Sequence, residues 1–296
     1  MKPESIVEKT LAEVLAEFRA SATSDADKGS KFERLTKFYL IKDPIWSEQL
    51  TNVRLREEAG IGPDVGIDLV ADDIASGGKV AIQCKFYDER TYLDDLGTFY
   101  TSSGKDGYVK RIVITTSNQW TRNAEEALKN QQIPVQRILL HDMEQSLISW
   151  GAFDLTENYG SVPIAQKELR PHQVDALNAV MGGFKEADRG KVIMACGTGK
   201  TLVSLRIAEE FFKKKKTPST VLFLAPSISL LSQTIMEWGQ NKKSSYMALA
   251  VCSDVKVGKK YDDDMQVTDL AIPASTDVEK LAAALVNRGT KNLVIF

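Results

Sequence analysis

The sequence has few of the residues that build disulfide frameworks and histidine metal sites. Only two of its 296 residues are histidine, and its three cysteines (Cys84, Cys196 and Cys252) stand far apart. That spacing suits a reducing compartment and gives neither a disulfide framework nor a zinc motif. No apolar run approaches the roughly 20 residues that a membrane-spanning helix needs. The N-terminus leads into an acidic amphipathic helix and not a signal peptide, so we expect a cytoplasmic protein.

The sequence also lacks a large excess of either charge. Its formal net charge is −2, with 26% charged and 43% hydrophobic residues, the composition of a globular protein. Contacts with nucleic acid would therefore depend on local patches and not on an overall basic surface. The length allows two domains that each bury a core.

The clearest motif runs from Met194 to Thr201, with the letters MACGTGKT. The apolar pair Val192 and Ile193 predicts a strand before it, and the residues after it predict a helix over 202–212. Glycines at 197 and 199 let several backbone N–H groups point at one anion, and the helix N-terminus adds positive charge. The phosphate-loop pattern then assigns Lys200 to the β- and γ-phosphates and Thr201 to Mg²⁺. Met194 stands where that pattern has glycine, and an ordinary strand–turn–helix corner is the alternative.

The N-terminal half predicts a mixed α/β domain with a central sheet. Apolar spacing indicates a helix over 5–18, a polar loop over 21–28 and a second helix over 31–41 that carries Glu33. A strand is expected over 49–55, followed by a hairpin of strands 66–71 and 79–86 around Ser76, Gly77 and Gly78. Helices and strands then alternate, with expected helices at 93–101, 122–130 and 142–150 and expected strands at 111–115 and 135–140.

The hairpin contains the candidate chemistry. Side chains alternate faces along a strand, so Gln83 and Lys85 point the same way, and Asp68 lies on the partner strand. A carboxylate, an amide oxygen and a lysine on one face are able to hold a hard cation and orient a water molecule. The residues alone leave a second interpretation open, a solvated charge pair across a hairpin.

Residues 28–150 resemble the Mrr-like branch of the PD-(D/E)xK nuclease superfamily. The resemblance rests on Glu33 in an early helix, on Gly66-Ile-Asp68 and on Gln83-Cys-Lys85, with Gln in place of the second acid. It implies that Asp68 is the main Mg²⁺ ligand and Gln83 a neutral ligand. Lys85 would position the water and stabilise charge on the phosphate, and Glu33 would be an outer ligand. One negative charge fewer implies weaker metal binding when DNA is absent.

A stretch without clear periodicity, 151–166, separates the two halves. We expect a nuclease domain over 1–155, a linker over 156–168 and an incomplete RecA-like lobe over 169–296. The run from Leu169 to Gln173 opens a helix expected over 174–184, and taken alone it is a helix start with proline. About 25 residues before a phosphate loop it resembles the Q motif of superfamily 2 helicases and translocases. That resemblance assigns Gln173 to adenine, and therefore ATP as the nucleotide.

Beyond the phosphate loop, residues 220–225 predict a buried strand, and Pro226 and Ser227 open a further helix. This segment resembles motif Ia of the same superfamily, which implies that Ser227 contacts a DNA phosphate. The four lysines at 213–216 have two interpretations: they stabilise the end of a helix and keep the protein soluble, or they form a DNA-binding patch. Asp262 to Asp264 suit a solvated loop better than a metal site. Later elements are expected at 247–252 (strand), 281–286 (helix) and 292–296 (strand).

A nuclease of this type followed directly by a translocase lobe resembles the Type ISP restriction–modification enzymes. The resemblance implies a Mg²⁺-dependent endonuclease coupled to ATP-driven movement along double-stranded DNA. The D-E-x-H motif and the second RecA-like lobe have not appeared by Phe296. We therefore expect a larger protein that also contains a methyltransferase and target recognition, and little ATP hydrolysis by this chain alone. Two alternatives stay open: a defence or repair nuclease–helicase without methyltransferase, and a DNA-tracking motor with a non-cleaving nuclease-like module.

Overall fold

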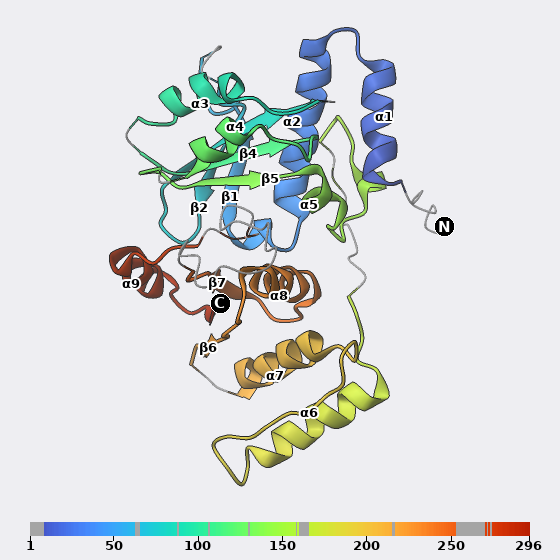
Figure 1. The fold of residues 1–296 in the computed structure, drawn as a ribbon, viewed down its shortest axis with the longest axis vertical. Helices are drawn as coiled ribbons and strands as arrows, with labels where there is room; N and C mark the ends of the chain where they lie inside the picture. The colour runs from blue at the N-terminus through green and yellow to red at the C-terminus, as the bar shows by residue number, and fades with distance from the viewer. Residues whose placement is uncertain are drawn as a thin grey trace.

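The chain folds around two separate β-sheets, as the computed structural model shows (Figure 1). The structure describes residues 9–62, 66–87, 89–105, 107–129, 131–157, 159, 166–214, 217–252, 270, 272 and 274–296. The expected site at Asp262 to Asp264 and part of the expected linker lie outside these residues. Among the described residues, no helix has the length and apolarity to cross a bilayer.

The first sheet has five strands in the order β1-β2-β3-β4-β5. β1, β2 and β3 are antiparallel neighbours, and β4 and β5 continue the sheet in parallel. The strands are β1 (Leu50–Leu55), β2 (Leu69–Asp73), β3 (Lys79–Lys85), β4 (Tyr108–Thr115) and β5 (Val135–Ile138). The expected hairpin and the alternation after it are confirmed, although β2 begins later than expected.

Helices cover both faces of this sheet, because its buried strands are apolar on both sides (Figure 1). One face packs on α1 (Leu11–Ser21), α2 (Asp25–Lys42) and α5 (Leu140–Glu144). The other packs on α3 (Gly97–Ser102) and α4 (Arg122–Leu128). Short 3₁₀ turns complete the unit at η1 (Trp46–Glu48), η2 (Leu93–Leu96) and η3 (Trp150–Ala152).

The helix boundaries near the N-terminus differ from those expected. The loop expected over 21–28 covers only residues 22–24, because α2 begins at Asp25, where the Ser24 hydroxyl accepts from the backbone N–H of Asp27. The first helix begins at Leu11 and extends to Ser21, with Thr10 as its cap. Both starts follow N-capping, which satisfies free N–H groups and outweighs apolar spacing. The helix expected over 142–150 is also wrong, since α5 ends at Glu144.

The second sheet is parallel, in the order β6-β8-β7. Its strands are β6 (Thr220–Leu222), β7 (Tyr246–Leu249) and β8 (Asn292–Ile295), and its helices are α6 (Pro171–Gly183), α7 (Lys200–Lys214), α8 (Ile228–Asn241) and α9 (Val278–Asn287). An apolar cluster joins α7 and α8 to β8, and a smaller one joins α9 to β7 and β8.

Two strand predictions in this unit need correction: one strand is absent, and the strand expected over 220–225 is present as β6 but is shorter and more exposed. Residues 190–195 form no strand, and the Ile193 side chain is 92% exposed. β6 is short and not buried: Leu222 is 63% exposed, and Leu224, beyond the end of the strand, is 81% exposed. A strand needs a hydrogen-bonded neighbour: among the described residues, 190–195 have none, and β6 is an edge strand that pairs with β8 on one side only.

The two units share a closely packed interface. Gly239 on α8 lies against Ile45, and a Cβ at position 239 would lie 2.4 Å from Ile45 Cγ1. Lys242 pairs with Glu48 at 3.1 Å and donates to the carbonyl of Pro44 at 2.8 Å. Burial lowers the pKa of Lys242, because a buried positive charge is costly, and the negative charge of Glu48 opposes this effect. Removing Glu48 would leave the buried charge of Lys242 without its partner and would destabilise the interface.

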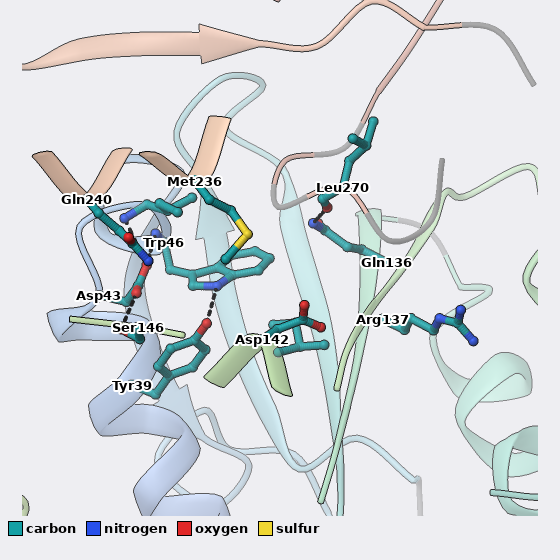
Figure 2. A pocket seen from close by; sticks show the side chains of 12 residues that line it. Tyr39, Asp43, Trp46, Gln136, Arg137, Asp142, Ser146, Met236, Gln240 and Leu270 are labelled. Atoms are coloured by element: carbon teal, nitrogen blue, oxygen red, sulfur yellow. Dashed lines mark hydrogen bonds between the residues drawn. The ribbon is translucent and has the colours of Figure 1, made fainter. Parts of the chain in front are cut away.

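A small cavity lies within the same interface (Figure 2). Asp43, Trp46 and Ser146 line it from the first unit, and Met236 and Gln240 line it from α8. The buried Asp43 carboxylate accepts from the Ser146 hydroxyl at 2.6 Å. Gln240 also donates to the carbonyl of Gln145, at 2.7 Å. Apolar packing, an ion pair and polar contacts therefore all join the two units.

The close contact at Gly239 gives a stability prediction. Gly→Ala inside a helix normally stabilises by about 0.5–1 kcal/mol, but overpacking costs about 1–3 kcal/mol. Gly239→Ala should therefore destabilise the chain, because the new methyl group meets Ile45. Gly182→Ala in α6 is the control, with no atom within 4 Å of its Cβ position, and should raise the melting temperature. Calorimetric unfolding measures both, and equal shifts would contradict the interface packing.

Candidate functional site

Asp68 lies just before β2, held by a glycine and by the neighbouring strand. Gly66 has φ of +66°, and a Cβ there would lie 2.8 Å from the backbone nitrogen of Phe99. Only glycine meets both conditions. The Asp68 carboxylate accepts from the backbone N–H of Cys84 at 2.7 Å. Burial raises the pKa of Asp68, while the Cys84 N–H and the nearby charges of Lys85 and Arg56 oppose that rise.

Gln83 lies on β3 and is 3% exposed. Its Oε1 atom is buried and has no hydrogen-bond partner among the described residues. A buried amide oxygen without a partner is costly, and most such atoms are satisfied by protein, water or an ion. The atom is therefore available to a ligand that accepts electron density, such as a cation.

Lys85, two residues further along β3, has its ammonium group 5.7 Å from the centre of the Tyr87 ring. The Tyr87 hydroxyl in turn donates to Asp95 at 2.8 Å. A cation over an aromatic face is weakly attracted to it, which orients a flexible lysine. Lys85 also acts on the Asp68 carboxylate, so the structure brings together these two predicted residues.

Glu33 lies on α2 and reaches the same place from one face of the sheet. Burial and, to a smaller extent, the negative charge of Asp68 raise the pKa of Glu33 to about 7, so the two carboxylates are electrostatic neighbours. Arg56 partly opposes this rise. Two acids that repel each other in a half-buried site attract a cation, because the cation relieves the repulsion.

These residues fit a hard cation such as Mg²⁺. The set offers two carboxylates and an unpartnered amide oxygen, the oxygen ligands that such ions prefer. The described residues contain no group of three or more acidic, histidine or cysteine side chains placed for a metal. A site at this position therefore depends on Gln83 as well as on the two acids.

The phosphate loop has the backbone that anion binding needs. Gly197 and Gly199 have φ of +74° and +81°, conformations that favour glycine. α7 begins directly at Lys200, so its free N–H groups follow the loop. Lys200 Nζ donates to the carbonyls of Met194 and Ala195, at 3.2 and 3.0 Å, which folds the lysine over its own loop.

Gln173 is the buried residue of α6 and is bonded to the phosphate loop. Its amide nitrogen donates to the Thr198 carbonyl at 2.9 Å, and its amide oxygen accepts from the Arg170 N–H at 2.8 Å. His172, which was not predicted as a site residue, has its Nε2 atom 3.2 Å from the same carbonyl oxygen. A Cβ on Gly199 would lie 2.2 Å from the Gln173 amide nitrogen. Gln173 therefore secures the loop in addition to any contact with a base.

Two further contacts lie at the N-termini of α8 and α7. The Ser227 hydroxyl accepts from the Leu230 N–H at 3.2 Å and caps α8. The Thr201 carbonyl accepts from Trp238 Nε1 at 3.0 Å, which joins α8 to the first turn of α7. Neither Trp238 nor Gly66 was recognised from the sequence as a positioning residue. A glycine two residues before the expected metal ligand was the available signal for Gly66.

Comparison with known proteins finds two family matches, one in each half of the chain. Residues 41–159 match a family described as "Restriction endonuclease", and residues 166–293 match "Type III restriction enzyme, res subunit". The ATP-dependent Type ISP restriction-modification enzyme LlaBIII bound to DNA is 31% identical, with a TM-score of 0.81 over 96% of this chain.

A second solved structure is a nuclease-deletion mutant of the Type ISP restriction-modification enzyme LlaGI in complex with a DNA substrate mimic. It is 38% identical to this chain, and the match covers 44% of this chain and 12% of the LlaGI chain with a TM-score of 0.37. No curated protein matches the chain. The chain spans 18% of the length of LlaBIII.

The raised pKa of Glu33 predicts a pH-dependent stability. Its folded pKa of about 7 exceeds the ordinary 4.5, so between these values the folded protein binds more protons than the unfolded one. The free energy of unfolding should therefore fall as pH rises from 4.5 to 7 in the presence of a chelator. Glu33→Gln should lessen that fall, as denaturant unfolding at pH 5 and pH 8 would measure. Glu144→Gln, at an exposed position on α5, is the control and should leave the pH dependence of the free energy of unfolding unchanged.

Proposed function

We propose that the chain cuts DNA with Mg²⁺ and binds ATP for movement along double-stranded DNA. It joins a restriction-endonuclease domain to a helicase-type domain, as the N-terminal region of the Type ISP enzymes does. The nuclease domain would comprise residues 1–155 and the RecA-like lobe residues 169–296, joined by a linker over 156–168. Family matches and the two separate sheets support this division.

Two observations carry the proposal: the Oε1 of Gln83 is buried and unpartnered, and the Asp68 carboxylate is bonded to the backbone N–H of Cys84, the residue next to Gln83. Asp68 and Gln83 would hold Mg²⁺, with Glu33 as an outer ligand. When bound, the ion supplies positive charge for the phosphate and lowers the pKa of a water molecule. Lys85, oriented by Tyr87, would position the attacking water and stabilise negative charge on the phosphate oxygens.

ATP would bind at the other sheet, on Gly197, Thr198, Gly199, Lys200 and Thr201. The loop backbone and the N-terminus of α7 support a triphosphate site. Lys200 would exchange its two carbonyl contacts for phosphate oxygens, and Thr201 would contribute a Mg²⁺ ligand. Ser227 would contact a DNA phosphate at the start of α8.

The remaining parts of the proposed enzyme are inferred from the family alone. A second RecA-like lobe would complete ATP hydrolysis, and a methyltransferase with target recognition would choose the site. The proposed location is the cytoplasm.

The nuclease proposal is tested by two substitutions. Asp68→Ala should remove the main cation ligand, and Lys85→Ala the cation that positions water. Each should reduce nicking of supercoiled plasmid in Mg²⁺ or Mn²⁺ by about a hundredfold or more. ATP binding should be unchanged, because it involves the other sheet.

Asp72→Ala and Lys79→Ala are controls from the opposite ends of β2 and β3 and should nick normally. Full nicking by both site variants would refute the assignment. No nicking by the unaltered chain would instead favour a DNA-binding role for this domain.

The nucleotide proposal predicts an effect of Gln173→Ala on both affinity and base preference. The loop loses its bond at Thr198, and the adenine loses its proposed partner. We expect ATP affinity to fall about tenfold, the equivalent of one hydrogen bond of about 1.4 kcal/mol, and the preference for ATP over GTP to weaken. Fluorescent-nucleotide titration measures both. Gln233→Ala, exposed on α8, is the control. An unchanged preference would remove Gln173 from the base site.

A further inference from the structure

Arg56 occupies a fixed position beside Asp68. It follows the last residue of β1, and its backbone N–H donates to the Asp68 carbonyl at 2.8 Å. This bond continues the β1–β2 register, in which Leu55 lies opposite Leu69. Residues opposite each other in an antiparallel pair have their side chains on the same face. The next turn is also closed, since Ile61 N–H donates to the Arg56 carbonyl at 3.1 Å.

The Arg56 side chain differs from the other cations near α2. Arg34 pairs with Glu157 at 2.7 Å, and Lys37 pairs with Glu58 at 2.7 Å. Arg56 is half-buried and has no ion-pair partner among the described residues. Its positive charge nevertheless opposes the rise in the pKa of both Asp68 and Glu33, so it acts on the two acids without being bound to either.

A guanidinium in this position suits a phosphate. DNA brings negative charge to a site that already contains two carboxylates, and this repulsion must be offset. A bound cation offsets part of it, and Lys85 offers a single point charge. Arginine adds a planar pair of N–H donors that matches two phosphate oxygens.

We propose that Arg56 binds a DNA phosphate at the cleavage site, next to the cation held by Asp68 and Gln83. The inference rests on the proposed nuclease function and adds a phosphate-binding residue to it. Before DNA binds, the Arg56 charge repels an incoming metal ion. When DNA is present, the same charge holds the strand against the metal site. One side chain would therefore oppose metal binding and favour cleavage.

These two roles predict opposite effects of Arg56→Ala in the full 296-residue chain. Nicking of supercoiled plasmid in Mn²⁺ should fall about tenfold or more, as expected when a charged phosphate contact is lost. Affinity for Mn²⁺ without DNA, measured by calorimetry, should rise about threefold because a neighbouring positive charge is gone. Arg56→Lys should recover part of the nicking and retain the original Mn²⁺ affinity.

Arg54→Ala is the matched control, two residues earlier on β1, and should change neither quantity. Unchanged nicking by Arg56→Ala would overturn the proposal. A fall in both nicking and Mn²⁺ affinity would also overturn it, because a purely structural residue has that effect. If the unaltered chain does not nick DNA, the nuclease proposal itself fails, and that result is separate from either outcome for Arg56.

Discussion

The antiparallel pairing of β1, β2 and β3 is the constraint on which the proposed nuclease site depends. It sets Arg56 opposite Asp68 and brings Asp68 within 2.7 Å of the Cys84 N–H, between Gln83 and Lys85. A shift of one residue in this register would turn Gln83 and Lys85 to the opposite face. Gly66 helps to fix this register at the start of the hairpin, since a side chain at this position would collide with the backbone of α3.

The second site depends on a contact between distant segments. Gln173 starts α6 and Thr198 lies in the phosphate loop, and a bond between them joins the two. This contact matters because residues 190–195 form no strand and therefore give the loop no sheet to hold it. The loop is instead held by Gln173 on one side and by α7 with Trp238 on the other.

Much of the fold was predictable from the sequence, for reasons visible in particular residues. The hairpin followed from two apolar runs around Ser76, Gly77 and Gly78, and the α/β class from the alternation after it. The start of α2 was missed because Ser24 caps it through a hydrogen bond that apolar spacing does not reveal. The missing strand before the phosphate loop has a different cause: Val192 and Ile193 are apolar, but a strand exists only with a neighbour. The proposed role of Arg56 and the close packing of Gly239 depend on tertiary contacts that local sequence patterns do not show.

The interface at Ile45, Glu48, Gly239 and Lys242 has a consequence for how such enzymes diversify. A nuclease domain exchanged by recombination at the linker would arrive without the Glu48 that pairs with Lys242, or with a bulkier side chain facing Gly239. An unpaired buried lysine or an overpacked helix would then destabilise the hybrid. The surface of α8 and the segment before β1 should therefore be inherited together, although about 190 residues separate them in the chain.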